Sequence, residues 1–199
     1  GGDLLFHAGN TLDLEAQGGG LRLSSGSALG GSTGHVRLTS ADSASAGRSG
    51  TVVVDSGTTT KGRSGHVHVS TGASSAGGAG DLSLHAGASG SGQGSRVVVA
   101  AGDTSGELTG GHLSITSGHS SLSTSGHLDV ATADSGVTGS SGRVAISTGT
   151  AAGEVGRIDI HAGLSTASQG GSIGLVAGSG VDAGDIEIQS GGSSTLDGG

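Results

Sequence analysis

Nine histidines are the side chains of this 199-residue protein best suited to bind a metal ion. His66 and His68 are two residues apart in an alternating segment, which places both imidazoles on one side of an extended chain. His35 occupies a matching segment that begins 31 residues earlier. If the two segments lie side by side, these three imidazoles could bind a transition metal. The interpretation we favour is that all three are solvated on an exposed face, so we predict no metal site.

Serine, histidine and aspartate, the residues of hydrolase triads, are abundant, but their arrangement does not indicate an enzyme. No serine lies in a Gly-x-Ser-x-Gly elbow between a strand and a helix, and a core of aliphatic and small residues forms no large pocket. The calcium-binding repeat Gly-Gly-x-Gly-x-Asp is approached once, from Gly178 to Asp182. The sole lysine, Lys61, lacks the glycines of a phosphate loop. We predict no catalytic residue, no cofactor-binding residue and no cofactor.

Composition narrows the choice of partner and compartment. Eight Lys and Arg against 16 Asp and Glu give a net charge of −8, which argues against binding to nucleic acid. The absence of Cys excludes disulfides and zinc-thiolate sites. The longest apolar run, Val97 to Ala101, is far too short to span a membrane. The chain starts with Gly1 and lacks Met, so we expect a processed product or a fragment.

One motif positions all of these residues and recurs along the whole chain. It reads Gly, any residue, aliphatic, any residue, aliphatic, any residue, then Ser, Thr or Ala, and finally Gly or Ala. The thirteen copies begin at Gly2, Gly19, Gly34, Gly50, Gly65, Gly80, Ser95, Gly111, Gly126, Gly142, Gly156, Gly171 and Gly184. All 26 aliphatic positions hold Leu, Val or Ile except Phe6. Disordered low-complexity sequences do not keep such a register, so the regularity argues against disorder.

Alternation within each copy predicts a β-strand with one buried face. In the fifth copy Val67 and Val69 point inward, whereas His66 and His68 point outward. No segment shows a helical period, and the segments between copies are rich in turn-forming Gly, Ser and Ala. The final motif position tolerates Ala at two copies, so its glycines are expected to serve close packing at a corner rather than a positive φ. The predicted class is all-β.

Spacing between copies predicts the arrangement of the strands. The step from an odd-numbered copy to the next is never shorter than the even-to-odd step that follows it. Outward residues at the centre of odd copies are large or charged, whereas those of even copies are mostly small. These differences favour a flattened parallel β-solenoid of two sheets, with about two 15-residue repeats per coil. The alternatives are one copy per coil and an antiparallel meander.

The array is predicted to be a single domain over residues 1–199, with copies from Gly2 to Gly191 and no cap at either end. Open sheet ends pair with other strands, so we expect part of a longer chain or end-to-end self-association. The outward midline of even copies, which includes Ser114 and Ala145, is nearly uncharged. Interfaces deplete charge at their cores, so this stripe is the predicted surface for lateral association.

Copies such as Gly142–Gly149 and Gly111–Gly118 resemble the Gly/Ser-rich repeats of secreted surface, filament and adhesin proteins. The resemblance implies an extracellular or cell-surface location and a non-catalytic role in a filament, fibre or adhesive stalk. The alternative function is that of an ice-binding β-solenoid. Such proteins present a regular Thr-x-Thr array, whereas Thr51 and Thr116 are isolated here. We therefore favour the structural role.

Overall fold

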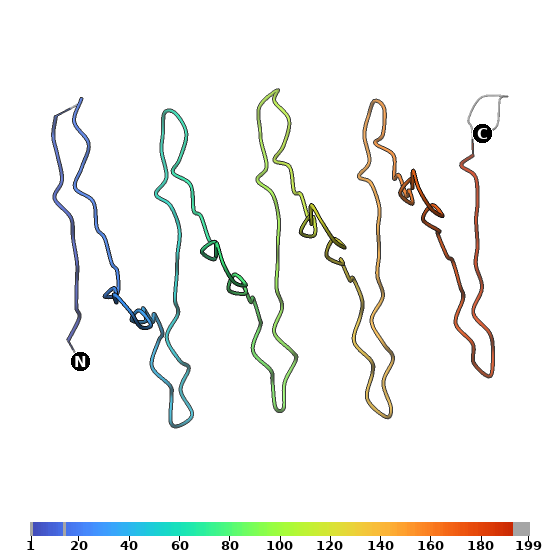
Figure 1. The fold of residues 1–199 in the computed structure, drawn as a ribbon, viewed down its shortest axis with the longest axis horizontal. Coiled ribbons are helices and arrows are strands. Elements are labelled where there is room, and N and C mark those ends of the chain that lie inside the picture. Colours follow the sequence, from blue (N-terminus) through green and yellow to red (C-terminus); the bar gives the residue numbers. More distant parts are fainter. Residues whose placement is uncertain (1, 14, 193–199) are drawn as a thin grey trace. The chain divides into compact units, whose positions relative to one another are not determined.

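The computed structural model describes residues 2–13 and 15–192. This part of the chain contains no α-helix and no β-strand, and its backbone is irregular apart from short turns and bends (Figure 1). Since the described residues form no sheet, the predicted all-β class and the flattened parallel β-solenoid with two sheets are wrong. What remains of the prediction is the division of the sequence into copies of the motif and connecting segments.

The chain divides into two units, Gly1–Val99 and Ala100–Gly199. The boundary lies inside the seventh copy of the motif, Ser95 to Gly102, where the sequence pattern continues without a break. In each unit, motif copies alternate with connecting loops, which we call arcs. The arcs comprise residues 10–18, 27–33, 42–49, 58–64, 73–79, 88–94, 103–110, 119–125, 134–141, 150–155, 164–170 and 179–183.

The predicted β-strand with one buried face is not formed in the described copies, and Val67 and Val69, which were predicted to point inward, are 53% and 65% exposed. Two copies do show contacts between side chains two residues apart. The side chains of Arg157 and Asp159 form an ion pair, with 2.8 Å between Nε and Oδ2. Ser83 Oγ lies 2.5 Å from His85 Nε2. In both cases the partners are two residues apart, which is the spacing that puts side chains on one side of an extended backbone. These two copies are therefore extended where the side chains meet, and no described copy has a neighbouring strand of a sheet.

Backbone hydrogen bonds close six arcs at their base. In each, the first glycine of one copy donates its N–H to the carbonyl of the last glycine of the copy before it. The N···O distances are 2.9 Å for Gly19–Gly9, 3.1 Å for Gly34–Gly26, 2.8 Å for Gly111–Gly102, 2.9 Å for Gly126–Gly118, 3.0 Å for Gly171–Gly163 and 2.9 Å for Gly184–Gly178. One bond per arc holds consecutive copies together at a point, whereas a ladder would hold them along their length.

Glycine is required at the arc base by close approach of the two chain segments. A Cβ built on Gly111 would lie 2.9 Å from the Gly102 nitrogen and 3.1 Å from its oxygen. No other atom could occupy that space without moving the backbone. Among the described glycines only Gly62, inside an arc, has a positive φ, at 98°. The last motif glycines have no positive φ, as expected, but the close packing predicted for them is wrong, because a Cβ there would meet nothing within 4 Å. The crowded position is the first glycine of several copies.

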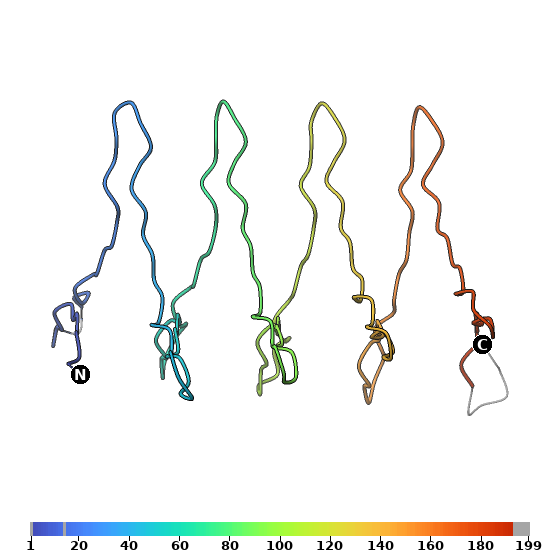
Figure 2. The same ribbon diagram turned by 90° about the horizontal axis from the view of Figure 1, so that it is seen from below.

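The path of the chain repeats every three copies within each unit. In the first unit, arcs 27–33 and 73–79 project on the same side, and arcs 119–125 and 164–170 do so in the second (Figure 2). The paired arcs are three copies apart in the sequence. The prediction of two copies per coil is therefore wrong, because it pairs arcs that are two copies apart. Odd and even copies do not separate into two faces.

The absence of a sheet follows from what each copy offers for burial. A copy and its arc span about fifteen residues and supply only two aliphatic side chains. Ordering a backbone rich in glycine costs more conformational entropy than ordering any other, and two small side chains do not offset it. Consistent with this, no described residue is buried, so this part of the chain has no core.

Candidate interaction surface

The two aliphatic positions of every copy form what we call the aliphatic row, and all of it is open to solvent. Exposed fractions run from 49% for Val52 and Ile158 to 85% for Ile188. In twelve of the thirteen copies the first aliphatic side chain is less exposed than the second, for example 49% against 69% for Val52 and Val54. The first position lies nearer the arc base, where consecutive copies approach each other.

The total exposed area shows how much burial is left unmade. The chain exposes 20013 Å². A compact protein of its mass, 18.4 kDa, exposes about 8,200 Å², and the fully unfolded chain about 26,700 Å². The structure therefore leaves about 12,000 Å² more surface in water than a compact domain would. The aliphatic row lies within this solvent-exposed surface.

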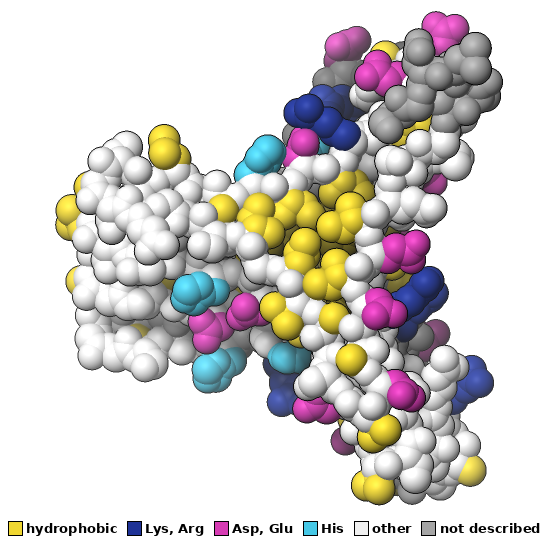
Figure 3. Space-filling view, turned by 90° about the vertical axis from the view of Figure 1, so that its right-hand side faces the viewer, with side chains coloured by type: hydrophobic (Ala, Val, Ile, Leu, Met, Phe, Trp, Pro, Cys, Tyr) yellow, Lys and Arg dark blue, Asp and Glu magenta, His cyan; other side chains and the backbone are white. Residues whose placement is uncertain are grey.

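Aliphatic side chains of consecutive copies meet at one hollow of about 310 Å³. Phe6 of the first copy and Leu21 and Leu23 of the second line it, together with Arg22. The bond from Gly19 to Gly9 closes the arc between these copies and brings the two rows to the same hollow. At this arc base, the aliphatic-row residues of the first two copies therefore share one apolar surface. On the face seen in Figure 3, hydrophobic side chains likewise gather in the middle.

Most arcs contain a hydroxyl cap, by which we mean a Ser or Thr side chain that hydrogen-bonds to the backbone of its own arc. The sequence analysis did not predict it. The second residue of an arc is Ser or Thr in nine of the twelve arcs, and in all nine its side-chain oxygen bonds to the local backbone. Thr11, Ser74, Ser89, Thr104, Ser120 and Ser165 accept a bond from a backbone N–H two or three residues later. Ser43, Thr59 and Ser135 donate to a backbone carbonyl instead. These bonds shape the turn from within.

Aligning the arcs on the last residue of the preceding copy would have revealed the hydroxyl position from the sequence alone. The position is then Ser or Thr except at Ala28, Ala151 and Gly180. Such a preference is specific, because Ser and Thr together occupy only about a quarter of the chain. The hydroxyls are structural, since each is engaged by the chain's own backbone.

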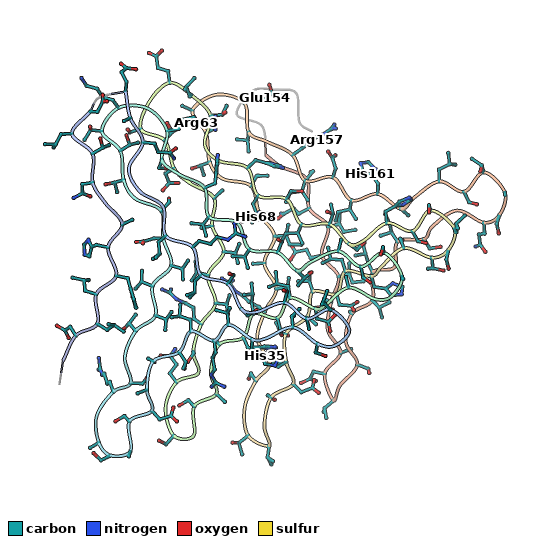
Figure 4. All side chains as sticks on the ribbon, turned by 60° about the vertical axis from the view of Figure 1, so that its left-hand side comes forward. His35, Arg63, His68, Glu154, Arg157 and His161 are labelled. Carbon is teal, nitrogen blue, oxygen red and sulfur yellow. The ribbon has the colours of Figure 1, made fainter. Side chains whose placement is uncertain are left out.

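Histidines are not gathered into a metal site. The described part of the chain, residues 2–13 and 15–192, holds no group of three or more His, Asp or Glu side chains that could hold a metal ion. In Figure 4, His35 and His68 lie on separate segments. His66 and His68 share a segment, as their spacing requires, but His35 does not join them. The arrangement behind the three-imidazole hypothesis depended on copies two apart lying side by side.

Charged side chains make one ion pair among the described residues, between Arg157 and Asp159. Their side chains are 85% and 43% exposed, so water screens the pair and it contributes little to stability. A second hollow, of about 480 Å³, is lined by Glu154, Val155, Gly156 and Arg157. It offers one carboxylate and a guanidinium already bonded to Asp159. This set lacks the nucleophile and base of an acyl-transfer site.

Comparison with protein-family models, with curated proteins and with solved structures gives no match to this chain. Among the residues that the structure describes, no helix is long and apolar enough to cross a membrane. The functional argument therefore rests on the repeat, the exposed aliphatic row and the arcs.

Proposed function

We propose that the chain is a non-catalytic structural repeat protein that self-associates to form part of an extracellular filament, fibre or adhesive stalk. The observation that carries the proposal is the exposure of the aliphatic row in all thirteen copies. Soluble monomers rarely expose contiguous apolar patches larger than a few hundred Å², and larger ones mark interaction sites. A surface repeated thirteen times along one chain suits an assembly that is itself repetitive.

The amount of exposed area favours an extended assembly over a simple dimer. The excess over a compact domain is about 12,000 Å², whereas obligate dimers bury about 2,000–5,000 Å² in total. One neighbour cannot cover this surface, so each chain needs several. Contacts that repeat with several neighbours produce fibres when they do not close into a ring.

The motif copies and the charge support the location and the choice of partner. Copies such as Gly142–Gly149 resemble the Gly/Ser-rich repeats of secreted surface, filament and adhesin proteins. The net charge of −8 favours a partner other than nucleic acid. No observation favours ice binding, because the described residues form no flat sheet on which a threonine array could lie.

Electron microscopy of the purified chain over a range of concentrations tests the proposal. We expect filaments or fibres whose number rises with concentration, and immunogold labelling of source cells outside the plasma membrane. Particles that stay monomeric at every concentration would contradict the assembly, and labelling confined to the cell interior would contradict the location.

A further inference from the structure

We propose that the aliphatic row is the interface between separate molecules of this protein. The row of one molecule is covered by the row of another molecule. The inference rests on the proposed self-association and names the surface that carries it. It replaces the small-residue stripe of Ser114 and Ala145 predicted from the sequence, because that stripe required a separate even face that the structure does not form.

Alternation gives most copies one apolar side and one polar side, although Leu5, Val53 and Val98 stand at the centre of the opposite side in three of them. Ile115 belongs to the row and is 65% exposed, whereas its neighbours Ser114 and Thr116 point to the other side of the extended segment. The polar side carries the charges of the odd copies. The charged central outward residues are Arg37, Asp129, Asp159 and Glu187. A partner that covers apolar area without desolvating charge must therefore approach from the row side.

Spacing within the row identifies the partner as a second copy. Two aliphatic side chains, two residues apart, recur about every fifteen residues along the chain, and among protein partners one with the same spacing can meet all of them. A second molecule of this protein has that spacing because its sequence is the same. The exposed area also exceeds what one pairwise contact buries, which requires a partner that is itself multivalent. A repeat chain meets this condition too.

A single introduced tryptophan tests the inference, since the chain has no Trp or Tyr and its emission would report that one site. Ile115→Trp places the probe in the row, and Ser114→Trp places it one residue away on the polar side. We expect the emission of Ile115→Trp to shift to shorter wavelengths as concentration rises, in step with the increase in mass measured by sedimentation. The emission of Ser114→Trp should stay that of a solvated indole throughout.

Four outcomes would overturn the inference. A shift of Ile115→Trp that does not depend on concentration would show that the chain covers its own row. A shift that needs added phosphatidylcholine vesicles would assign the row to a lipid surface. Assembly seen by sedimentation and microscopy with the Ile115→Trp probe still solvated would keep the proposed function and reject this surface, whereas a monomer at every concentration would reject both.

Discussion

Motif copies and arcs differ in what holds them. The copies contain the 26 aliphatic positions of the motif. In the described part of the chain, no ladder of backbone hydrogen bonds joins one copy to another. Arcs are short of apolar side chains but are rich in local bonds, with a hydroxyl cap in nine and a glycine pair closing six. The same chain thus has loops that are formed from within and straight segments that have no partner.

This difference indicates where the missing stability must come from. An arc needs only its own residues, because a hydroxyl and a backbone amide two or three positions apart meet without help from the rest of the chain. An aliphatic side chain gains free energy only when something covers it. The described residues make no such long-range burial, and under the proposed function it comes from assembly.

The largest effect should come from charging the aliphatic row. We expect Ile115→Asp with Ile146→Asp to raise the concentration needed for assembly at least about 100-fold, because each loses the ~1.5–3 kcal/mol of a buried aliphatic and adds a charge. The matched control is Ser114→Asp with Ala145→Asp, which adds the same charge one residue away. Light scattering against concentration measures both. Equal losses in the two double variants would contradict the division into an apolar and a polar side.

A smaller effect is expected when the arc base is crowded. Gly111→Ala puts a Cβ 2.9 Å from the Gly102 nitrogen, so the 2.8 Å bond between these residues should break. The loss is about 0.5–1.5 kcal/mol, which raises amide exchange at residue 111 by about 2- to 12-fold. Gly80→Ala is the control, because a Cβ there meets nothing within 4 Å. Unchanged exchange in Gly111→Ala would mean that the arc is not closed by this pair.

Hydroxyl caps should contribute slightly less. Ser120→Ala removes the acceptor of the Ser123 N–H, so the arc at 119–125 should lose about 0.5–1 kcal/mol of local order. Ser121→Ala removes an adjacent hydroxyl that makes no such bond and should change nothing. The reverse substitution, Ala28→Ser, should create a cap in an arc that lacks one. Backbone chemical shifts report all three variants, and identical spectra for Ser120→Ala and Ser121→Ala would sink the assignment.

The smallest effect is expected at the ion pair. Asp159→Asn removes the partner of Arg157, but both side chains are well exposed and the pair is screened. Assembly and backbone shifts beyond the neighbouring residues should match those of the unchanged chain across a salt titration. A clear loss of assembly in this variant would show that charge on the polar side takes part in the interface.

The sequence predicted local features better than distant ones. Alternation predicted a β-strand with one buried face, and this is wrong, because the described residues contain no strand and none is buried. The contacts of Arg157 with Asp159 and of Ser83 with His85 show only that side chains two residues apart share a side in these two copies. Alternation does not tell which strand lies beside which, because pairing depends on burial that two aliphatic side chains per copy do not supply. The two-copy coil was inferred from step lengths and outward residues. Neither of them determines which copies lie side by side.

The candidate sites divide in the same way. His66 and His68 share a side because they are two residues apart, which the sequence contains. His35 was expected beside them only because of the two-copy coil. Since that coil is not formed, the expectation for His35 is wrong as well. The arc hydroxyls were within reach of the sequence, since Ser74, Ser120 and Ser165 occupy one position relative to the closing glycine.

Small-angle X-ray scattering over a dilution series tests the central claim, that the chain does not cover its own aliphatic row, most directly. A compact chain of 199 residues has a radius of gyration of about 16 Å. We expect the dilute monomer to be larger than about 25 Å, because it exposes 20013 Å², and we expect mass to increase as concentration rises. A monomer near 16 Å whose mass is independent of concentration would contradict the account.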